Sequence, residues 1–204
     1  MSQTRPHERG RAAEPFIPRH DLTPAAIRGV LLSLALMLLA ASLDSTAVST
    51  ALPRIVADLQ SSDLYTWVFT VYLLAMTASM PVFGSLSDRL GRRPILFLGL
   101  VAFVVGSILC ALAGEMWQLV LFRAIQGLGA GAITPVALAI LGDLFAPAER
   151  ARIQAIFGSI FVLAFLIGPT LGGIFADTIG WRWVFYINLP VTFVAMLGIW
   201  RLMP

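Results

Sequence analysis

Lysine is absent from this chain, and charged residues of any kind are scarce. All 14 positively charged residues are arginine, only 12% of the 204 residues are charged, and 58% are hydrophobic. The single cysteine, Cys110, excludes an intrachain disulfide. Nothing in the sequence resembles a metal cluster, a nucleophile paired with a base, or a phosphate-binding loop. We therefore expect neither an enzyme nor a bound metal or cofactor, and a net charge of +3 gives little support to nucleic-acid binding.

Long apolar runs make up most of the chain. Each has 18 to 26 residues, enough to cross a hydrocarbon core of roughly 30 Å as a helix that rises about 1.5 Å per residue. The alternation expected of barrel strands is absent, and unpaired backbone groups are not tolerated in lipid, so the runs predict helices. The sequence thus predicts an all-α membrane protein with six transmembrane helices, over residues 29–52, 66–86, 94–114, 117–142, 153–176 and 183–200.

The arginines are distributed unevenly between the two sides of these runs. Eleven precede the first run, follow the sixth, or lie in the second–third and fourth–fifth connections, whereas only Arg54 and Arg182 lie on the other side. Because basic residues are retained in the cytoplasm, both termini are expected there. Residues 1–27 predict a disordered cytoplasmic tail. Abundant arginine and alanine without lysine indicate a bacterial genome of high GC content, and hence an inner membrane.

Two charges lie inside the apolar runs. Asp44 is 15 residues from the cytoplasmic start of its run, roughly 22 Å deep, and Arg123 is about 9 Å from the opposite surface, so both can occupy one layer. A charge in a span costs about 2.5 to 3.5 kcal/mol and usually faces a cavity or a partner. Gln126 follows Arg123 at i+3, among small residues typical of a cavity wall. The alternative is a static ion pair that only fixes helix packing.

A cluster of glycines around a proline, GPTLGG at residues 168–173, lies inside the fifth run. Ala164, Gly168 and Gly172 form a ridge of small residues at i, i+4 and i+8. Pro169 removes a backbone hydrogen bond, and Gly173 adds a second adjacent glycine. Two interpretations remain open: close helix packing, or a bend that shapes or seals a cavity.

The turn between the second and third runs reads GSLSDRLGRRP, residues 84–94. Gly84 permits close packing at the end of the second helix, and Gly91 supplies a free backbone for the turn. The preference of basic residues for the cytoplasmic side of the membrane is enough to account for the three arginines, Arg89, Arg92 and Arg93. It does not account for Asp88, because a negative charge is disfavoured at the C-terminal end of a helix. We expect Asp88 to face an arginine or the N-terminus of another helix, with a role in gating.

These segments resemble signatures of the major facilitator superfamily. GSLSDRLGRRP is similar to its cytoplasmic loop signature between helices 2 and 3, LVLFRAIQGLGAG to its helix 4 signature, and GPTLGG to the helix 5 signature of its antiporter branch. LDSTAVSTALPRI and WRWVFYINLP are similar to segments of the 14-helix drug/proton antiporter subfamily. The signatures occur in the expected order over residues 43–190. One departure is Ala164, where the helix 5 signature often has glycine.

The resemblance implies one six-helix half of a proton-driven multidrug exporter that works by alternating access, with the proton gradient as its energy source. Asp44, Arg123 and Gln126 would then couple protons to substrate. Desolvation favours the neutral form of Asp44 and Arg123 favours the ionised form, so its proton could be exchanged. The residues of the inward gate would be Gly84, Asp88, Arg89, Gly91, Arg92 and Arg93. Those favouring export would be Gly168, Pro169, Gly172 and Gly173.

The sequence reaches Pro204 directly after the sixth run, whereas such transporters enclose their substrate between two six-helix halves. We expect the N-terminal part of a longer transporter. The alternatives are a half-transporter that forms a homodimer, a non-transporting membrane interaction protein, and, less favoured because of GPTLGG, a nutrient uptake transporter. Expected partners are the lipid bilayer, the second half or a second copy, and small amphipathic molecules, with lipophilic cations as candidates. The substrate itself is not predicted.

Overall fold

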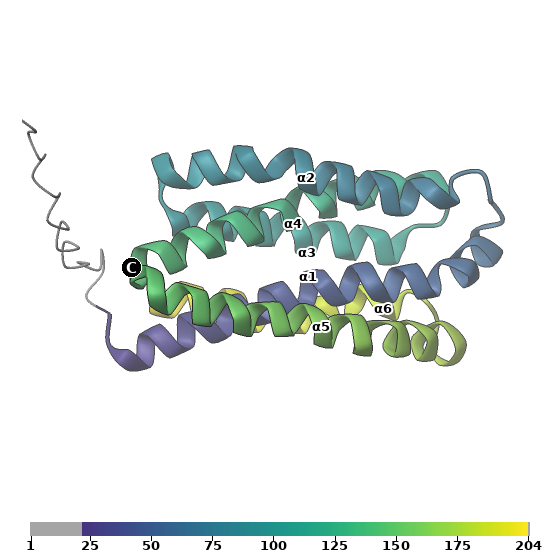
Figure 1. The fold of residues 1–204 in the computed structure, drawn as a ribbon. Helices are drawn as coiled ribbons and strands as arrows, with labels where there is room; N and C mark the ends of the chain where they lie inside the picture. The colour runs from purple at the N-terminus through teal and green to yellow at the C-terminus, as the bar shows by residue number, and fades with distance from the viewer. Residues whose placement is uncertain (1–21, 204) are drawn as a thin grey trace, which may run out of the picture.

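The computed structural model describes residues 22–203, which form helices joined by short turns (Figure 1). Within this range the structure contains no strand, and six helical segments are long and apolar enough to span a membrane, with α6 and α7 together making the sixth. The all-α fold and the six transmembrane helices are therefore confirmed. The helices are α1 Pro24–Leu59, α2 Tyr65–Leu90, α3 Arg92–Leu112, α4 Met116–Leu144, α5 Pro147–Thr178, α6 Trp183–Tyr186 and α7 Asn188–Leu202.

The helices extend beyond the apolar runs, most clearly at α1. Thr23 caps this helix by accepting a hydrogen bond from the backbone N–H of Ala26, and Pro24 occupies its first turn. Most of the expected tail, residues 1–21, lies outside the described residues, and the last four residues assigned to it are helical. Pro53 does not end α1, which continues to Leu59.

The sixth expected run is divided into α6 and α7 at Ile187. Pro190 lies one turn beyond the division and has no N–H to donate to the carbonyl of Tyr186. The interruption leaves Asn188 as the first residue of α7, where its side chain is buried.

The helices form two groups of three spans (Figure 1). In one group α2 and α3 pack against α4, and in the other α1 packs against α5 and α7. The start of α1, the α2–α3 turn, the α4–α5 connection and the end of α7 lie at one end of the bundle. This end carries the larger set of arginines, as the sequence predicts.

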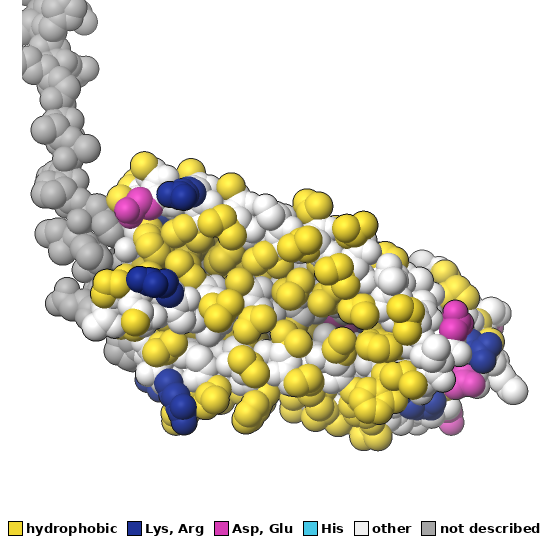
Figure 2. All heavy atoms as spheres, turned by 90° about the horizontal axis from the view of Figure 1, so that it is seen from below, with side chains coloured by type: hydrophobic (Ala, Val, Ile, Leu, Met, Phe, Trp, Pro, Cys, Tyr) yellow, Lys and Arg dark blue, Asp and Glu magenta, His cyan; other side chains and the backbone are white. Residues whose placement is uncertain are grey.

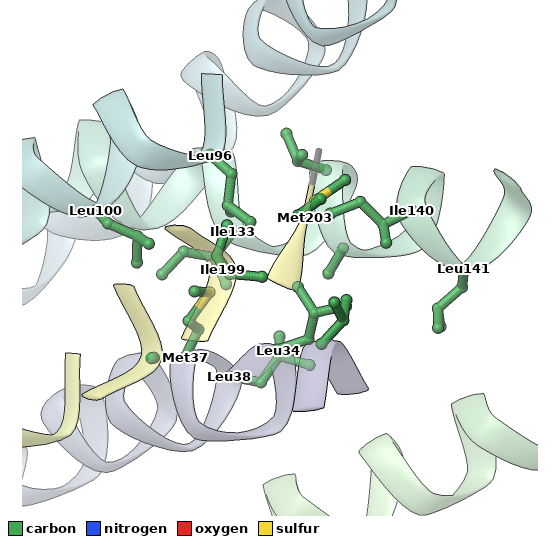
Figure 3. Packing of buried hydrophobic residues seen from close by; sticks show 14 of the residues in the cluster. Leu34, Met37, Leu38, Leu96, Leu100, Ile133, Ile140, Leu141, Ile199 and Met203 are labelled. Carbon is green, nitrogen blue, oxygen red and sulfur yellow. The ribbon is translucent and has the colours of Figure 1, made fainter. Parts of the chain in front are cut away.

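A buried apolar cluster joins the two groups (Figure 3). Leu34 and Met37 of α1 meet Leu100 of α3, Ile133 of α4 and Ile199 of α7, and all five are at most 1% exposed. In a bilayer such burial contributes little hydrophobic free energy, because lipid tails are equally apolar. Packing quality therefore matters more than apolar area.

Glycines provide that packing around α4. A Cβ at Gly127 would lie 2.5 Å from the Tyr72 carbonyl oxygen of α2, and one at Gly106 of α3 would lie 2.6 Å from backbone atoms of Gln126. Both contacts are too short for any larger residue. They hold α2 and α3 directly against the part of α4 that carries Gln126.

Apolar side chains cover the middle of the bundle surface, and charged side chains are concentrated at its two ends (Figure 2). Exposed large residues include Leu74, Val105, Phe165, Phe193 and Trp200. A surface of this kind is suited to lipid rather than water. The chain is thus a multi-pass membrane protein.

Candidate functional site

Asp44 and Arg123, the two charges predicted to share one layer, form an ion pair in the bundle interior. Arg123 Nη1 on α4 donates to Asp44 Oδ2 on α1 at 2.5 Å, and neither side chain is exposed. The residues are 79 positions apart in sequence. The structure thus places the two charges in one layer, as their depths predicted, and pairs them.

Two amide side chains complete the shell of the Asp44 carboxylate. Gln126 Nε2 donates to Asp44 Oδ1 at 2.9 Å, and Asn188 Nδ2 donates to the same oxygen at 2.7 Å. Ser107 Oγ accepts from Gln126 Nε2 at 2.7 Å and lies 3.4 Å from Asn188 Nδ2. We call Asp44, Arg123, Gln126, Ser107 and Asn188 the interior network; it joins α1, α3, α4 and α7.

Sequence reasoning identified three members of this network and missed Ser107 and Asn188. Asn188 lies in the WRWVFYINLP segment, and an asparagine within an apolar run was a usable signal because amides in membrane helices bond across to other helices. Ser107 gave no comparable signal, since serines in such helices often bond to their own backbone. Only the close approach at Gly106 brings Ser107 to Gln126.

Aromatic rings enclose the guanidinium of Arg123. Its carbon Cζ lies 3.9 Å from the centre of the Tyr72 ring and 6.0 Å from that of Phe185, and Nε donates to the Val68 carbonyl at 3.4 Å. Within residues 22–203, Arg123 Nη2 has no hydrogen-bond partner. Buried polar groups are normally paired, so the network has capacity for a further acceptor beside Arg123.

The chemistry of the network follows from its burial. Removing two ions from water costs several kcal/mol each, and the pair persists only where geometry and further hydrogen bonds compensate. Asp44 meets this condition through one cation and two amide donors. The buried carboxylate therefore depends on donors that belong to two other helices, α4 and α7.

Gly168 and Gly172 of the helix 5 cluster lie on the face of α5 that packs against α1. Side chains at these positions would overlap Thr46 and the backbone of Ala47, respectively. Thr46 Oγ1 also donates to the Ala164 carbonyl at 3.2 Å. These contacts support the interpretation as close helix packing, and the alanine at position 164 keeps the approach short.

The other two members of the cluster do not share this contact. The nearest atom to a Cβ at Gly173 would be 4.0 Å away, and Pro169 is exposed inside a helix that continues to Thr178. A role for these four residues in favouring export stays a prediction.

Arg92 is the centre of a second polar cluster, at the α2–α3 turn. Its Nε donates to Asp143 Oδ2 of α4 at 3.0 Å, and its Nη1 donates to Ser87 Oγ at 2.8 Å and to Asp88 Oδ1. We call these four residues the turn cluster. Asp88 thus faces an arginine, one of the two expected targets. Asp143 was missed because it lies one residue past the expected end of the fourth run.

The remaining turn residues have separate roles in the structure. Gly91 has φ +96°, a conformation that other residues rarely adopt, so it is required for the turn. A Cβ at Gly84 would make only an ordinary 3.7 Å contact, so the close packing expected there is not found. Arg93 donates to the Trp200 carbonyl at 2.9 Å, whereas Arg89 is exposed.

The model of one family, Major Facilitator Superfamily, matches residues 34–204 and so covers both polar clusters. The chain belongs to this superfamily. Membership confirms the resemblance of the five signature segments and makes the protein a transporter-family member rather than an enzyme.

Curated relatives of this superfamily member include efflux proteins. It is 45% identical over 177 residues to "Multidrug resistance protein 3" of Bacillus subtilis (strain 168), covering 87% of this chain and 35% of the relative. It is 46% identical over 160 residues to "Multidrug transporter protein MdtP" of the same strain, covering 78% and 30%. A fungal relative, "Efflux pump dotC" of Dothistroma septosporum, is 41% identical over 172 residues, covering 84% and 30%. The chain spans about a third of the length of these relatives.

Solved structures agree on the fold. A D-xylose-proton symporter superposes with a TM-score of 0.74 at 17% identity, covering 85% of this chain and 48% of the symporter. The human organic anion transporter MFSD10 gives 0.69 at 24% identity, covering 89% and 48%. At these identities the likeness concerns the fold alone, and it corresponds to one half of each transporter.

Proposed function

We propose that this chain forms the N-terminal six-helix half of a proton-coupled multidrug exporter, with Asp44 as the group that carries the proton. The observation that carries the proposal is the interior network, in which a fully buried carboxylate is held by Arg123, Gln126 and Asn188. The efflux proteins among its relatives support the direction and class of transport. Small amphipathic molecules, with lipophilic cations as the first candidates, are the proposed substrates.

The geometry of the Asp44 shell supports the proposed proton exchange. Arg123 and Gln126 belong to α4 and Asn188 to α7, so any sliding of α1 against these helices separates Asp44 from its donors. A carboxylate that loses its donors in a low-dielectric interior favours the protonated form. The two states of the helices would thereby correspond to two protonation states of Asp44.

The turn cluster is the proposed inward gate. Arg92 connects the α2–α3 turn to Asp143 at the end of α4. Opening of this end therefore either breaks that hydrogen bond or moves the turn and α4 together. The Asp88 side chain is 64% exposed, and among residues 22–203 its hydrogen-bond partner is Arg92, which leaves it accessible to another part of a complete transporter. The second six-helix half, or a second copy of the chain, is the proposed partner.

We propose an inner-membrane location with both termini in the cytoplasm, because the arginine-rich end of the bundle contains the start of α1 and the end of α7. Cysteine labelling of intact cells tests the orientation. A Ser62→Cys variant should react with a membrane-impermeant maleimide from outside, and an Arg89→Cys variant should react only in inverted vesicles. The native Cys110 is fully buried and should give little background. The reverse pattern would refute the orientation.

Ethidium transport into inverted membrane vesicles tests the proposed function. Under an imposed proton gradient, vesicles that contain this chain together with the proposed second half or a second copy should accumulate ethidium. Asp44→Asn should abolish the accumulation while the amount of protein in the membrane, measured by immunoblot, is unchanged. Asp177→Asn, at an exposed acid of α5, is the matched control and should transport normally. Gradient-driven accumulation by Asp44→Asn would contradict the proposal.

A further inference from the structure

A long apolar groove lies on the outside of the bundle between α3 and α7. Its inner part, of about 450 Å³, is lined by Val101, Val104, Val105, Leu189, Phe193 and Met196, among others. Its outer part, of about 490 Å³, is lined by Arg93, Pro94, Phe97, Leu98, Val101 and Trp200. Because both parts share Val101, we treat them as one feature, the α3–α7 groove.

The length of this groove matches one leaflet of a bilayer. From Pro94 to Val105 there are 11 residue steps along α3, which span roughly 16 Å. Half of a hydrocarbon core is about 15 Å thick. The groove therefore runs from the surface of the membrane to its middle, and its exposed walls, such as Val101, Val105 and Phe193, open to the lipid side.

A cation lies only at the mouth of the groove. Arg93 is held there by a 2.9 Å hydrogen bond to the Trp200 carbonyl and by stacking 5.2 Å from the Trp200 ring. Among residues 22–203 Arg93 makes no ion pair, in contrast to Arg92, which binds two carboxylates. Arg201, exposed and next in sequence to Trp200, adds a second positive charge. A guanidinium fixed in this way offers a planar fork suited to phosphate.

We infer that the α3–α7 groove binds one anionic glycerophospholipid, with its phosphate on Arg93 and an acyl chain along the apolar wall. The apolar lining of the groove requires an apolar occupant, and the cation at its mouth requires an anionic head. A free phosphate would satisfy only Arg93, and a zwitterionic lipid would bring its own cation toward two arginines. This inference does not depend on the transported substrate or on proton coupling.

The acyl chain of the bound lipid would also lie close to the interior network, on the lipid side of α3 and α7. Leu189 and Val104 line the groove, and their neighbours along the helices, Asn188 and Ser107, hold the Asp44 shell. A lipid here would press α3 and α7 together at the depth of that shell. The first expected effect of the lipid is therefore a more stable α3–α7 contact.

Native mass spectrometry of the detergent-purified protein tests the site with phosphatidylglycerol as the probe. The unaltered protein should retain one phosphatidylglycerol, and Arg93→Gln should weaken retention about tenfold, as expected for loss of charge-assisted hydrogen bonds to a phosphate. Arg89→Gln, at an exposed arginine of the same turn that does not line the groove, is the matched control and should retain lipid normally. Equal retention by Arg93→Gln and the unaltered protein would overturn the inference.

Two further arms separate the sources of binding. Val105→Trp should fill the inner groove and reduce retention without altering the head site, and phosphatidylcholine should be retained less than phosphatidylglycerol. Glycerol 3-phosphate, which has the head without the chains, should not bind at the same concentration. Equal binding of phosphatidylcholine, or of glycerol 3-phosphate, would refute a built site for an anionic lipid. If a variant does not fold, the rise in melting temperature of the unaltered protein can be compared for phosphatidylglycerol, phosphatidylcholine and glycerol 3-phosphate. Phosphatidylglycerol should raise it most.

Discussion

The interior network and the turn cluster both contain an arginine bound to an aspartate, but they differ in their exposure to water. Arg123 and Asp44 have no exposed surface, whereas the side chains of Arg92 and Asp88 are 15% and 64% exposed. In the interior nothing replaces a lost partner, so each charge depends on the others. At the turn, water reaches Asp88 and can replace its lost partner at little cost, although Arg92 and Asp143 are only 15% and 13% exposed. Depth in the membrane thus distinguishes one arginine cluster, whose buried charges depend on one another, from another, in which Asp88 is open to water.

Removing Arg123 should have the largest effect. Arg123→Leu leaves the Asp44 charge buried without a cation and should lower the free energy of unfolding by about 3 to 5 kcal/mol. The double variant Asp44→Leu, Arg123→Leu should recover most of this loss. Unfolding in mixed detergent micelles by titration with dodecyl sulfate measures both values. Equal losses in the single and double variants would show that the pair is not the reason for the destabilisation.

Removing Asn188 should have an intermediate effect. Asn188→Leu deletes one of two amide donors to Asp44 Oδ1 and should cost about 1 to 3 kcal/mol of unfolding free energy. The same substitution made in an Asp44→Leu background should cost much less, because the acceptor is gone. If the cost is the same in both backgrounds, Asn188 contributes through packing and not through the carboxylate.

Removing Arg92 should have a smaller effect. Arg92→Gln breaks one ion pair to the exposed Asp88 and one to Asp143, whose side chain is 13% exposed. Because the cluster lies at an end of the bundle that water partly reaches, the loss of unfolding free energy should be on the order of 1 kcal/mol. Arg89→Gln, on the same turn, is the control and should have no measurable effect. A loss as large as that of Arg123→Leu would contradict the distinction between the two clusters.

Raising the salt concentration should have the smallest effect on the unfolding free energies, and it should change only the cost of Arg92→Gln. The Debye length falls to about 3 Å near 1 M salt, so the cost of Arg92→Gln should decrease there, whereas the cost of Arg123→Leu should not. The comparison requires each variant and the unaltered protein to be unfolded at low and high sodium chloride. Parallel salt dependence in both would show that water reaches the interior pair.

Much of this arrangement could be predicted from the sequence. The lengths of the apolar runs predicted six spans, and the depths of Asp44 and Arg123 predicted that both charges could occupy one layer, because a helix rises uniformly and a membrane fixes where it starts. Asp88, which the charge bias between the two membrane sides did not explain, was expected to face an arginine or the N-terminus of another helix, and it bonds to Arg92.

The parts that were missed depend on helix contacts, which no single run encodes. Ser107 joins the interior network because Gly106 lets α3 approach α4. Asn188 joins it because the helix is interrupted at Ile187, between α6 and α7. Asp143 was overlooked because an acid at the end of a run resembles an ordinary boundary residue. The expected tight packing at Gly84 was wrong, since the helices are not close enough there to require glycine.

Infrared difference spectroscopy across a pH titration of the membrane-embedded protein tests most directly whether Asp44 exchanges a proton. We predict a protonated-carboxyl band that grows as the pH falls and that is missing from Asp44→Asn but present in Asp177→Asn. A static ion pair would keep Asp44 ionised throughout. Identical difference spectra for the unaltered protein and Asp44→Asn would contradict the account.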